Sequence, residues 1–263
     1  MKTVEFSVNS PKAFTSYLQK FASIDSTLLF EVDLEQQRFI SKTPNEERSI
    51  VKYAVLPFSD AGFTLKGKGD IRIKVGVYNI SRLISIIEQF GDSFEFVIKY
   101  DEIMGSNNQK DYAAISLLTK NDELKFNTEC TSLTIFKYIS DTLYTNTIRK
   151  IDEIASFDIP RDVIEKVLSL SKLDKDYKLI EFQIQNGVFY AKGKSFKLKI
   201  CPLSSSDAVI DFYKEQFQKV DVENCRVTMG ADRMLFSSTE NISETIISRV
   251  EGNDKFEETV EDF

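Results

Sequence analysis

An internal repeat limits the folds open to this chain of 263 residues more than any other feature of its sequence. The segment PKAFTSYLQKFASID starts at Pro11 and PRDVIEKVLSLSKLD starts at Pro160, an offset of 160 − 11 = 149 residues. Apolar residues recur every three or four positions in both copies, which is typical of one helix face, and proline suits the first helical turn. Both segments therefore predict amphipathic helices. The predicted buried positions are Phe14, Leu18, Phe21 and Ile24 in the first copy and Val163, Val167, Leu170 and Leu173 in the second.

Two predicted strands follow each of these helices. Residues 28–34 and 38–40 alternate around a polar turn in the first copy, and residues 179–185 and 188–190 do so in the second. The dipeptide Asn186-Gly187 between the latter two is a strong hairpin signal. Because helix and hairpin recur in the same order, the sequence predicts an α+β protein made of two copies of one fold.

A second helix is predicted in each half. In the first half Asn79 is a good N-cap, apolar residues form a stripe up to Phe90, and Gly91 is a typical helix stop. In the second half a helix is expected near 212–220, although 208–213 fits a strand leading into it equally well. The other predicted strands are 71–78, 93–99, 112–118, 123–128, 225–229, 233–238 and 244–250.

The repeat also suggests how the chain is divided. We expect a first domain at 1–138, a linker at 139–152, a second domain at 153–253 and an acidic tail at 254–263. The linker prediction rests on the polar, threonine-rich stretch ISDTLYTNTIRK, which has no clear periodicity. A length of 263 residues is comfortable for two domains.

The composition argues against an enzyme. The chain has no histidine, which removes the commonest general base and the commonest metal ligand, and no known catalytic motif is present. Catalysis would need a pair of carboxylates, and the acidic pairs Asp101–Glu102 and Glu257–Glu258 fall in a predicted loop and in the tail. The sequence therefore predicts no enzyme activity, no cofactor and no metal.

The cysteines and the apolar runs indicate the compartment. Cys130, Cys201 and Cys225 are odd in number and far apart, which favours free thiols in a reducing environment over disulfides or a zinc site. The N-terminus has no apolar signal segment, and no run of 18 apolar residues occurs. These features predict a cytoplasmic protein without a membrane span.

The charge is acidic overall but unevenly distributed. The net charge is −7, which taken alone argues against nucleic acid. On a helical wheel, however, the polar faces of the four predicted helices lean towards lysine, arginine, serine and glutamine. Such faces suit loose contacts with phosphates that do not read the base sequence. The basic residues on them are Lys12, Lys20, Arg82, Arg161, Lys166, Lys172 and Lys214.

Together these features resemble the sliding clamps of DNA replication, and most of all the clamp of T-even and related tailed phages. The most similar stretches are LQKFASIDSTLLF at 18–30, SLTIF at 132–136 and the C-terminal Asp262-Phe263. The resemblance implies a closed homotrimer, with strands outside and helices lining a channel that encircles duplex DNA. It also implies that the seven basic residues face the channel, and that a replicative DNA polymerase and a clamp loader are the partners, in the host cytoplasm if a phage encodes the protein.

In this family, partner proteins insert an apolar peptide into a pocket beside the interdomain linker. The resemblance therefore makes Leu143, Tyr144, Ile246 and Val250 candidates for that pocket, although each also fits an ordinary core position. The chain departs from cellular clamps in its short fourth helix, which puts Lys214 in doubt. The alternatives are a structural or adaptor protein of a virion or multi-protein complex, and a processivity factor that does not encircle DNA.

Overall fold

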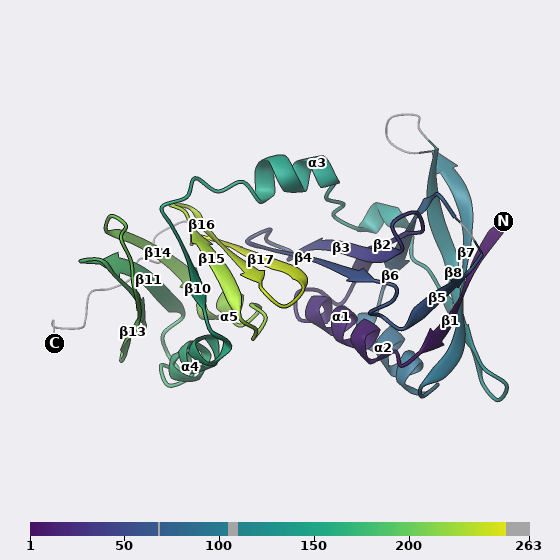
Figure 1. The fold of residues 1–263 in the computed structure, drawn as a ribbon, viewed down its shortest axis with the longest axis horizontal. Coiled ribbons are helices and arrows are strands. Elements are labelled where there is room, and N and C mark those ends of the chain that lie inside the picture. Colours follow the sequence, from purple (N-terminus) through teal and green to yellow (C-terminus); the bar gives the residue numbers. More distant parts are fainter. Residues whose placement is uncertain (68, 105–109, 251–263) are drawn as a thin grey trace. The chain divides into compact units, whose positions relative to one another are not determined.

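The computed structural model describes residues 1–67, 69–104 and 110–250 (Figure 1). The chain forms two compact units, which are described separately. The first contains residues 1–44 and 52–139, and the second contains residues 45–51 and the chain from 140 onward. The predicted acidic tail, 254–263, lies outside the described residues.

Most of the first unit is a sheet in the order β4-β3-β2-β6-β8-β7-β1-β5. Two strands pair with the same edge of β8. The first part of β8 pairs with β6 in parallel, and its last part pairs with β9 antiparallel. The strands are β1 (Lys2–Asn9), β2 (Leu28–Asp33), β3 (Arg38–Pro44), β4 (Ile50–Pro57, in this unit from Lys52), β5 (Phe63–Lys66), β6 (Arg72–Val77), β7 (Ser93–Met104), β8 (Lys110–Lys120) and β9 (Lys125–Glu129).

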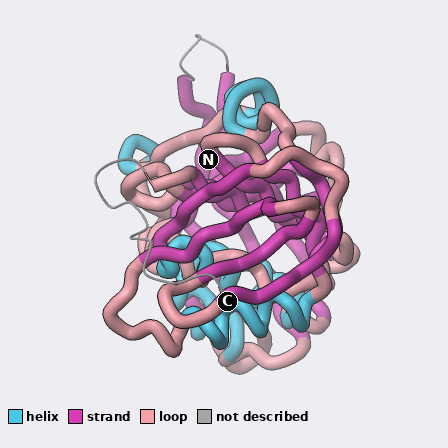
Figure 2. Tube along the Cα trace, turned by 90° about the vertical axis from the view of Figure 1, so that its left-hand side faces the viewer, coloured by secondary structure: helices cyan, strands magenta, loops and turns pink. Residues whose placement is uncertain are grey.

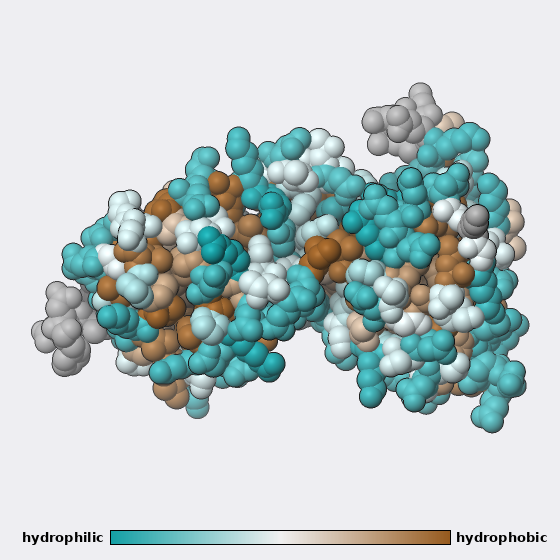
Figure 3. All heavy atoms as spheres, in the orientation of Figure 1, coloured by the Kyte–Doolittle hydropathy of each residue, from teal (hydrophilic) through white to brown (hydrophobic). Residues whose placement is uncertain are grey.

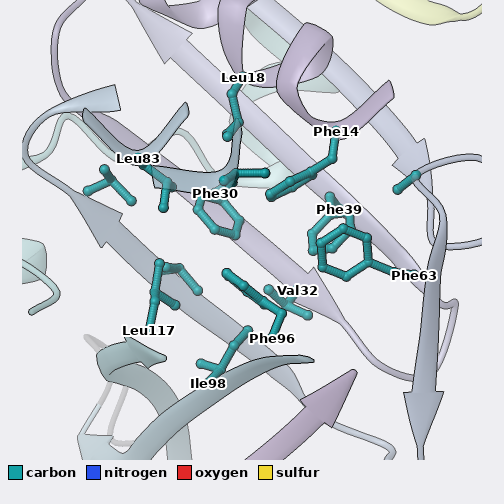
Figure 4. Packing of buried hydrophobic residues seen from close by; sticks show 14 of the residues in the cluster. Phe14, Leu18, Phe30, Val32, Phe39, Phe63, Leu83, Phe96, Ile98 and Leu117 are labelled. Atoms are coloured by element: carbon teal, nitrogen blue, oxygen red, sulfur yellow. The ribbon is translucent and has the colours of Figure 1, made fainter. Parts of the chain in front are cut away.

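Two helices, α1 (Lys12–Ala22) and α2 (Ile80–Glu88), pack against each other on one face of this sheet (Figure 1). Phe14 of α1 lies at the centre of the core, with its ring centroid 4.7 Å from that of Phe39 and 4.8 Å from that of Phe63 (Figure 4). Full burial of such a side chain contributes about 1.5–3 kcal/mol. The many phenylalanines of the sequence are thus explained by an aromatic core.

The second unit has two sheets, ordered β10-β15-β16-β17 and β13-β12-β11-β14. Phe182, Phe189 and Phe217 pack in its core with α4 (Arg161–Ser171) and α5 (Lys214–Phe217). Strands predominate over helices in the whole chain (Figure 2). The strands are β10 (Ala155–Ile159), β11 (Leu179–Gln185), β12 (Val188–Lys192), β13 (Lys197–Pro202), β14 (Ala208–Tyr213), β15 (Cys225–Met229), β16 (Arg233–Ser238) and β17 (Ile242–Ser248).

The predicted repeat is present, but its buried stripe is shifted by one residue. In α1 the buried residues include Phe14, Tyr17, Leu18 and Phe21, whereas in α4 they are Ile164, Val167 and Ser171. The two stripes therefore match at an offset of 164 − 14 = 150. Burial of Ser171 is possible because its hydroxyl donates to the carbonyl oxygen of Leu168 at 2.8 Å. The predicted core residue Leu173 is instead 70% exposed.

The fourth helix is much shorter than the predicted 212–220. Residues 208–213 form β14, which pairs with β11 and buries Ile210 and Phe212 on alternate positions. Only the four residues of α5 remain helical. Of the two alternatives left by the sequence, the strand is correct, because alternation over six residues satisfies both the sheet and the core.

Short helices occur just before and within residues 139–152, where a linker was predicted. A 3₁₀ turn, η1 (Leu133–Ile135), belongs to the first unit, and α3 (Asp141–Leu143) and a π-helical turn, η2 (Tyr144–Ile148), belong to the second. In the first unit, a side chain on Gly76 of β6 would collide with Phe136, since an added Cβ would lie 2.6 Å from that ring. The glycine therefore allows the segment after η1 to lie directly on the sheet.

Candidate nucleic-acid interface

The exposed face of α1 carries cations and no carboxylate. Lys12, Ser16 and Gln19 are exposed, and Lys20 is half-buried in the last turn. Thr15 donates its hydroxyl to the backbone carbonyl oxygen of Lys12 at 3.0 Å, and the Lys12 residue itself is exposed. A cation in the last turn is also favoured by the helix dipole. The structure thus gives α1 the basic and neutral face that the helical wheel predicts.

The exposed face of α2 is nearly neutral. Asn79 caps the helix as predicted, since its side-chain oxygen accepts the backbone N–H of Arg82 at 2.8 Å. Arg82, Ser85 and Gln89 are exposed, and Glu88 is exposed beside them. Because α1 and α2 are in contact, their exposed residues belong to one surface of the first unit. Hydrophilic residues cover most of the visible face of this unit (Figure 3).

In the second unit, α4 is acidic at its start and basic towards its end. Proline at the N-cap position cannot cap the helix with its side chain, so Asn224 supplies the oxygen that accepts the Arg161 backbone N–H at 2.9 Å. The guanidinium of Arg161 binds Glu165 at 2.9 Å, and this hydrogen bond raises the pKa of Arg161. Lys166 and Lys172 are exposed further along the helix. The charge of Arg161 is therefore partly offset.

Lys214 has a structural partner. Its ammonium, half-buried at the start of α5, donates to the backbone oxygen of Ser171 at 3.2 Å and to that of Asp174. Ser171 is the last residue of α4, where a cation is favourable, and Asp174 lies in the loop that follows. The prediction that Lys214 faces DNA stays a prediction, and this geometry gives it no support.

The four candidate pocket residues lie in the second unit but differ in exposure. Tyr144 and Ile246 are 4% and 2% exposed and belong to the core. Leu143 is 44% exposed, and Val250 is half-buried. Only Leu143 and Val250 therefore offer surface to a partner, while Tyr144 and Ile246 support the structure beneath. That these residues form a partner site stays a prediction.

Glu244 of β17 holds the helical segment 141–148 in place and was not singled out from the sequence. The hydroxyl of Tyr144 donates to its Oε2 at 2.5 Å, and Arg149 donates to its Oε1 through Nη2 at 2.8 Å. These two residues begin η2 and follow its end, and the backbone N–H of Arg149 donates to the oxygen of Tyr144 at 2.8 Å. One buried carboxylate therefore binds both ends of the π-helical turn, a type of turn that is frequent at functional sites.

A small cavity of about 60 Å³ in the first unit was also missed. The side chain of Ile135 at its rim is 53% exposed. The run SLTIF at 132–136 was the only signal in the sequence that pointed to this region. The cavity combines apolar and basic groups, and its lining includes Leu29, Lys42, Pro44, Ile135, Phe136 and Lys137.

The acidic pair and the cysteines, which could have suggested catalysis or metal binding, lie in strands, ion pairs or buried positions. Asp101 and Glu102 lie in β7 rather than in a loop, and Glu102 pairs with Lys110 at 3.1 Å. The cysteine thiols are free, and burial raises the pKa of Cys130 to about 12. Within the described residues, no three cysteine or acidic side chains are placed to hold a metal ion. The same part of the chain contains no helix that is long and apolar enough to cross a membrane.

Solved structures with the same arrangement of elements are DNA clamps. PCNA from Thermococcus kodakaraensis matches with a TM-score of 0.63 at 11% identity, over 94% of this chain and 100% of that chain. The Helicobacter pylori beta clamp bound to a DNA ligase peptide matches with a TM-score of 0.66 at 12% identity, over 94% and 66%. PCNA from A. fulgidus, bound to the C-terminal region of FEN-1, matches with a TM-score of 0.62 at 10% identity, over 95% and 100%.

The chain has the sliding-clamp fold. Neither a protein-family model nor a curated protein matches the sequence. At these identities the likeness establishes the fold, and the α+β class and pseudo-repeat predicted from the sequence are confirmed. The closer resemblance to phage clamps stays a prediction.

Proposed function

We propose that this protein is a sliding clamp, which encircles duplex DNA as a ring and tethers a replicative DNA polymerase for processive synthesis. One observation carries the proposal. A chain with a net charge of −7 has the sliding-clamp fold and places a face without carboxylates on α1, with Lys12 exposed. In the described structure Lys12, Arg82, Lys166 and Lys172 have no ion-pair partner, so these cations remain available for phosphates.

The contact with DNA would be weak and independent of base sequence. Lysine ammonium groups bind phosphates as point charges, and serine and glutamine add hydrogen bonds to the backbone without reading bases. Topology rather than affinity retains such a ring on DNA, so few cations are sufficient. The ring itself makes no catalytic contribution, and it would act in the cytoplasm, that of the host if a phage encodes it.

Two strand edges support closure into a homotrimer. Among the described strands, β5, β9, β10, β13 and β14 each pair with a single neighbour, and for β9 and β13 that neighbour is β8 and β12. Each therefore presents backbone N–H and C=O groups that another chain can pair with. Since β9 belongs to the first unit and β13 to the second, pairing β9 of one copy with β13 of the next is a heterologous contact, which generates rings when the rotation closes.

Two surfaces support the binding of partner peptides. Ile135 and Phe136 line the cavity of the first unit between the basic groups of Lys42 and Lys137, and Leu143 is exposed in the second. The beta clamp of H. pylori is bound to a DNA ligase peptide, and A. fulgidus PCNA to the C-terminal region of FEN-1. We propose that polymerase and clamp loader dock on these surfaces through short apolar segments.

Retention on DNA tests the proposal. The protein is placed on nicked circular DNA and on linear DNA of the same length, with loader and ATP from the source cell, and is separated from free protein by gel filtration. A ring stays on the circle and slides off the linear molecule. Equal retention on both contradicts encirclement, and no retention on either favours the structural or adaptor role.

A further inference from the structure

We propose that Lys172, Lys175 and Lys194 form a phosphate-binding site at the C-terminal end of α4, which extends the DNA contact beyond the helix faces. This inference rests on the proposed function. All three residues lie outside any helix: Lys172 directly follows α4, and Lys175 and Lys194 lie in turns. Three segments of the second unit meet at this point: the end of α4, the turn between β12 and β13, and the start of α5.

The carboxylate of Asp174 joins the first two segments. This side chain is only 8% exposed, and its Oδ2 accepts the backbone N–H of Ser195 at 3.2 Å, while its Oδ1 accepts the Ser195 hydroxyl. Hydrogen bonds of this charged type are stronger than neutral ones. The turn that carries Lys194 is therefore fixed next to the loop that carries Lys175.

Gly193 makes the close approach of this turn possible. A Cβ at position 193 would lie 2.5 Å from Oδ2 of Asp174 and 2.3 Å from the ring of Phe196. Any side chain there would push the turn away from the carboxylate. The position of Lys194 beside the end of α4 thus depends on the backbone itself and on one buried acid.

The third segment offsets the negative end of the helix. Backbone carbonyls at the end of α4 carry partial negative charge, and the ammonium of Lys214 binds that of Ser171, the last helical residue, and the carbonyl of Asp174 in the following loop. The ammonium of Lys214 therefore compensates the partial negative charge of the helix end, a role that an exposed lysine could otherwise take. The exposed lysines nearby are therefore not needed to cap the helix.

The three lysines are exposed and available. Within the described residues none of them has an ion pair or a side-chain hydrogen bond. Asp174 and Asp176 are the acids of the same loop, and with Lys214 counted beside the three lysines the charge at this point is 4 − 2 = +2. Two or more cations held by separate backbone segments suit an anion that carries several charges along its length.

A nucleic-acid backbone fits this cluster better than an acidic protein segment. The cluster continues the basic half of α4, where Lys166 and Ser169 are also exposed. A protein interface has a well-packed apolar centre with a polar rim. Here Leu173, 70% exposed, is an isolated apolar side chain among the lysines, and it provides a control for that alternative.

The test compares two charge-matched double variants of the full-length protein. Lys175→Glu with Lys194→Glu alters the proposed site, and Lys2→Glu with Lys150→Glu reverses two exposed lysines elsewhere. Binding to a fluorescent short duplex is measured over a range of salt concentrations. We expect the site variant to reduce the slope of log affinity against log salt by about 1.8, since each phosphate contact contributes about 0.9, and the control to change it little.

Each outcome separates the possibilities. If the wild-type protein shows no salt-dependent binding to the short duplex, the lysine site is overturned, while the proposed function is decided separately by retention on circular and linear DNA. If the wild type binds and both double variants bind equally well, only the lysine site is overturned. If Leu173→Ser weakens binding, and polyglutamate competes as well as unlabelled duplex does, the surface belongs to an acidic protein partner and the inference is wrong.

Discussion

Lys12 and Arg161 begin the two copies of the repeated helix, yet their cationic groups have different surroundings. Lys12 has no carboxylate beside it on α1, whereas Arg161 is bound by Glu165 one turn later. Both members of that pair are more than half exposed, so solvent screens the pair and it adds little to stability. Its larger effect is to occupy a guanidinium that could bind phosphate.

Substitutions at these two positions should therefore change DNA affinity in opposite directions. Lys12→Ala removes a free cation and should lower the salt slope of duplex binding by about 0.9, while Glu165→Gln releases Arg161 and should raise it by a similar amount. Fluorescence anisotropy at several salt concentrations measures both, and thermal unfolding checks that the fold is unchanged. Weaker binding by Glu165→Gln would remove Arg161 from the interface.

At the scale of elements, the sequence predicted strands well where apolar and polar residues alternate regularly. Strands β11, β15 and β16 have the predicted bounds, because alternation and turn residues define them. The stripe of α4 was misplaced because a serine that bonds its own helix can be buried as an alanine would be. The role of Glu244 was invisible for a different reason, since Tyr144 and Arg149 lie 100 and 95 residues away in the sequence.

The π-helical turn should depend on Glu244. Glu244→Gln keeps the shape of the side chain but loses the charged hydrogen bonds to Arg149, and we expect the free energy of unfolding to fall by about 1–3 kcal/mol. Amide hydrogen exchange should accelerate at residues 144–149 and stay unchanged in β11 and β12. Glu215→Gln, at an exposed position on α5, is the control. Unchanged exchange at 144–149 would show that the turn forms without the carboxylate.

For the whole molecule, the prediction concerns assembly. A closed trimer should have a solution mass of about three times 30.1 kDa, measured by light scattering coupled to gel filtration. A mass of 30.1 kDa at every concentration would favour the monomeric, non-encircling alternative. The sequence indicated the two-fold internal repetition but gave no information on the free edges of β9 and β13, because an edge is defined by the absence of a neighbour in space.

The long reach of Glu244 has a consequence for biosynthesis. A chain emerges from the ribosome with its N-terminal part first, and domains generally fold as units in that order. Arg149 is made 95 residues before the carboxylate that binds it. The segment around η2 therefore lacks this hydrogen-bond partner until β17 has been synthesised. A truncated product that stops before β17 would lack the carboxylate that binds Tyr144 and Arg149, so this segment would not be held in its folded position.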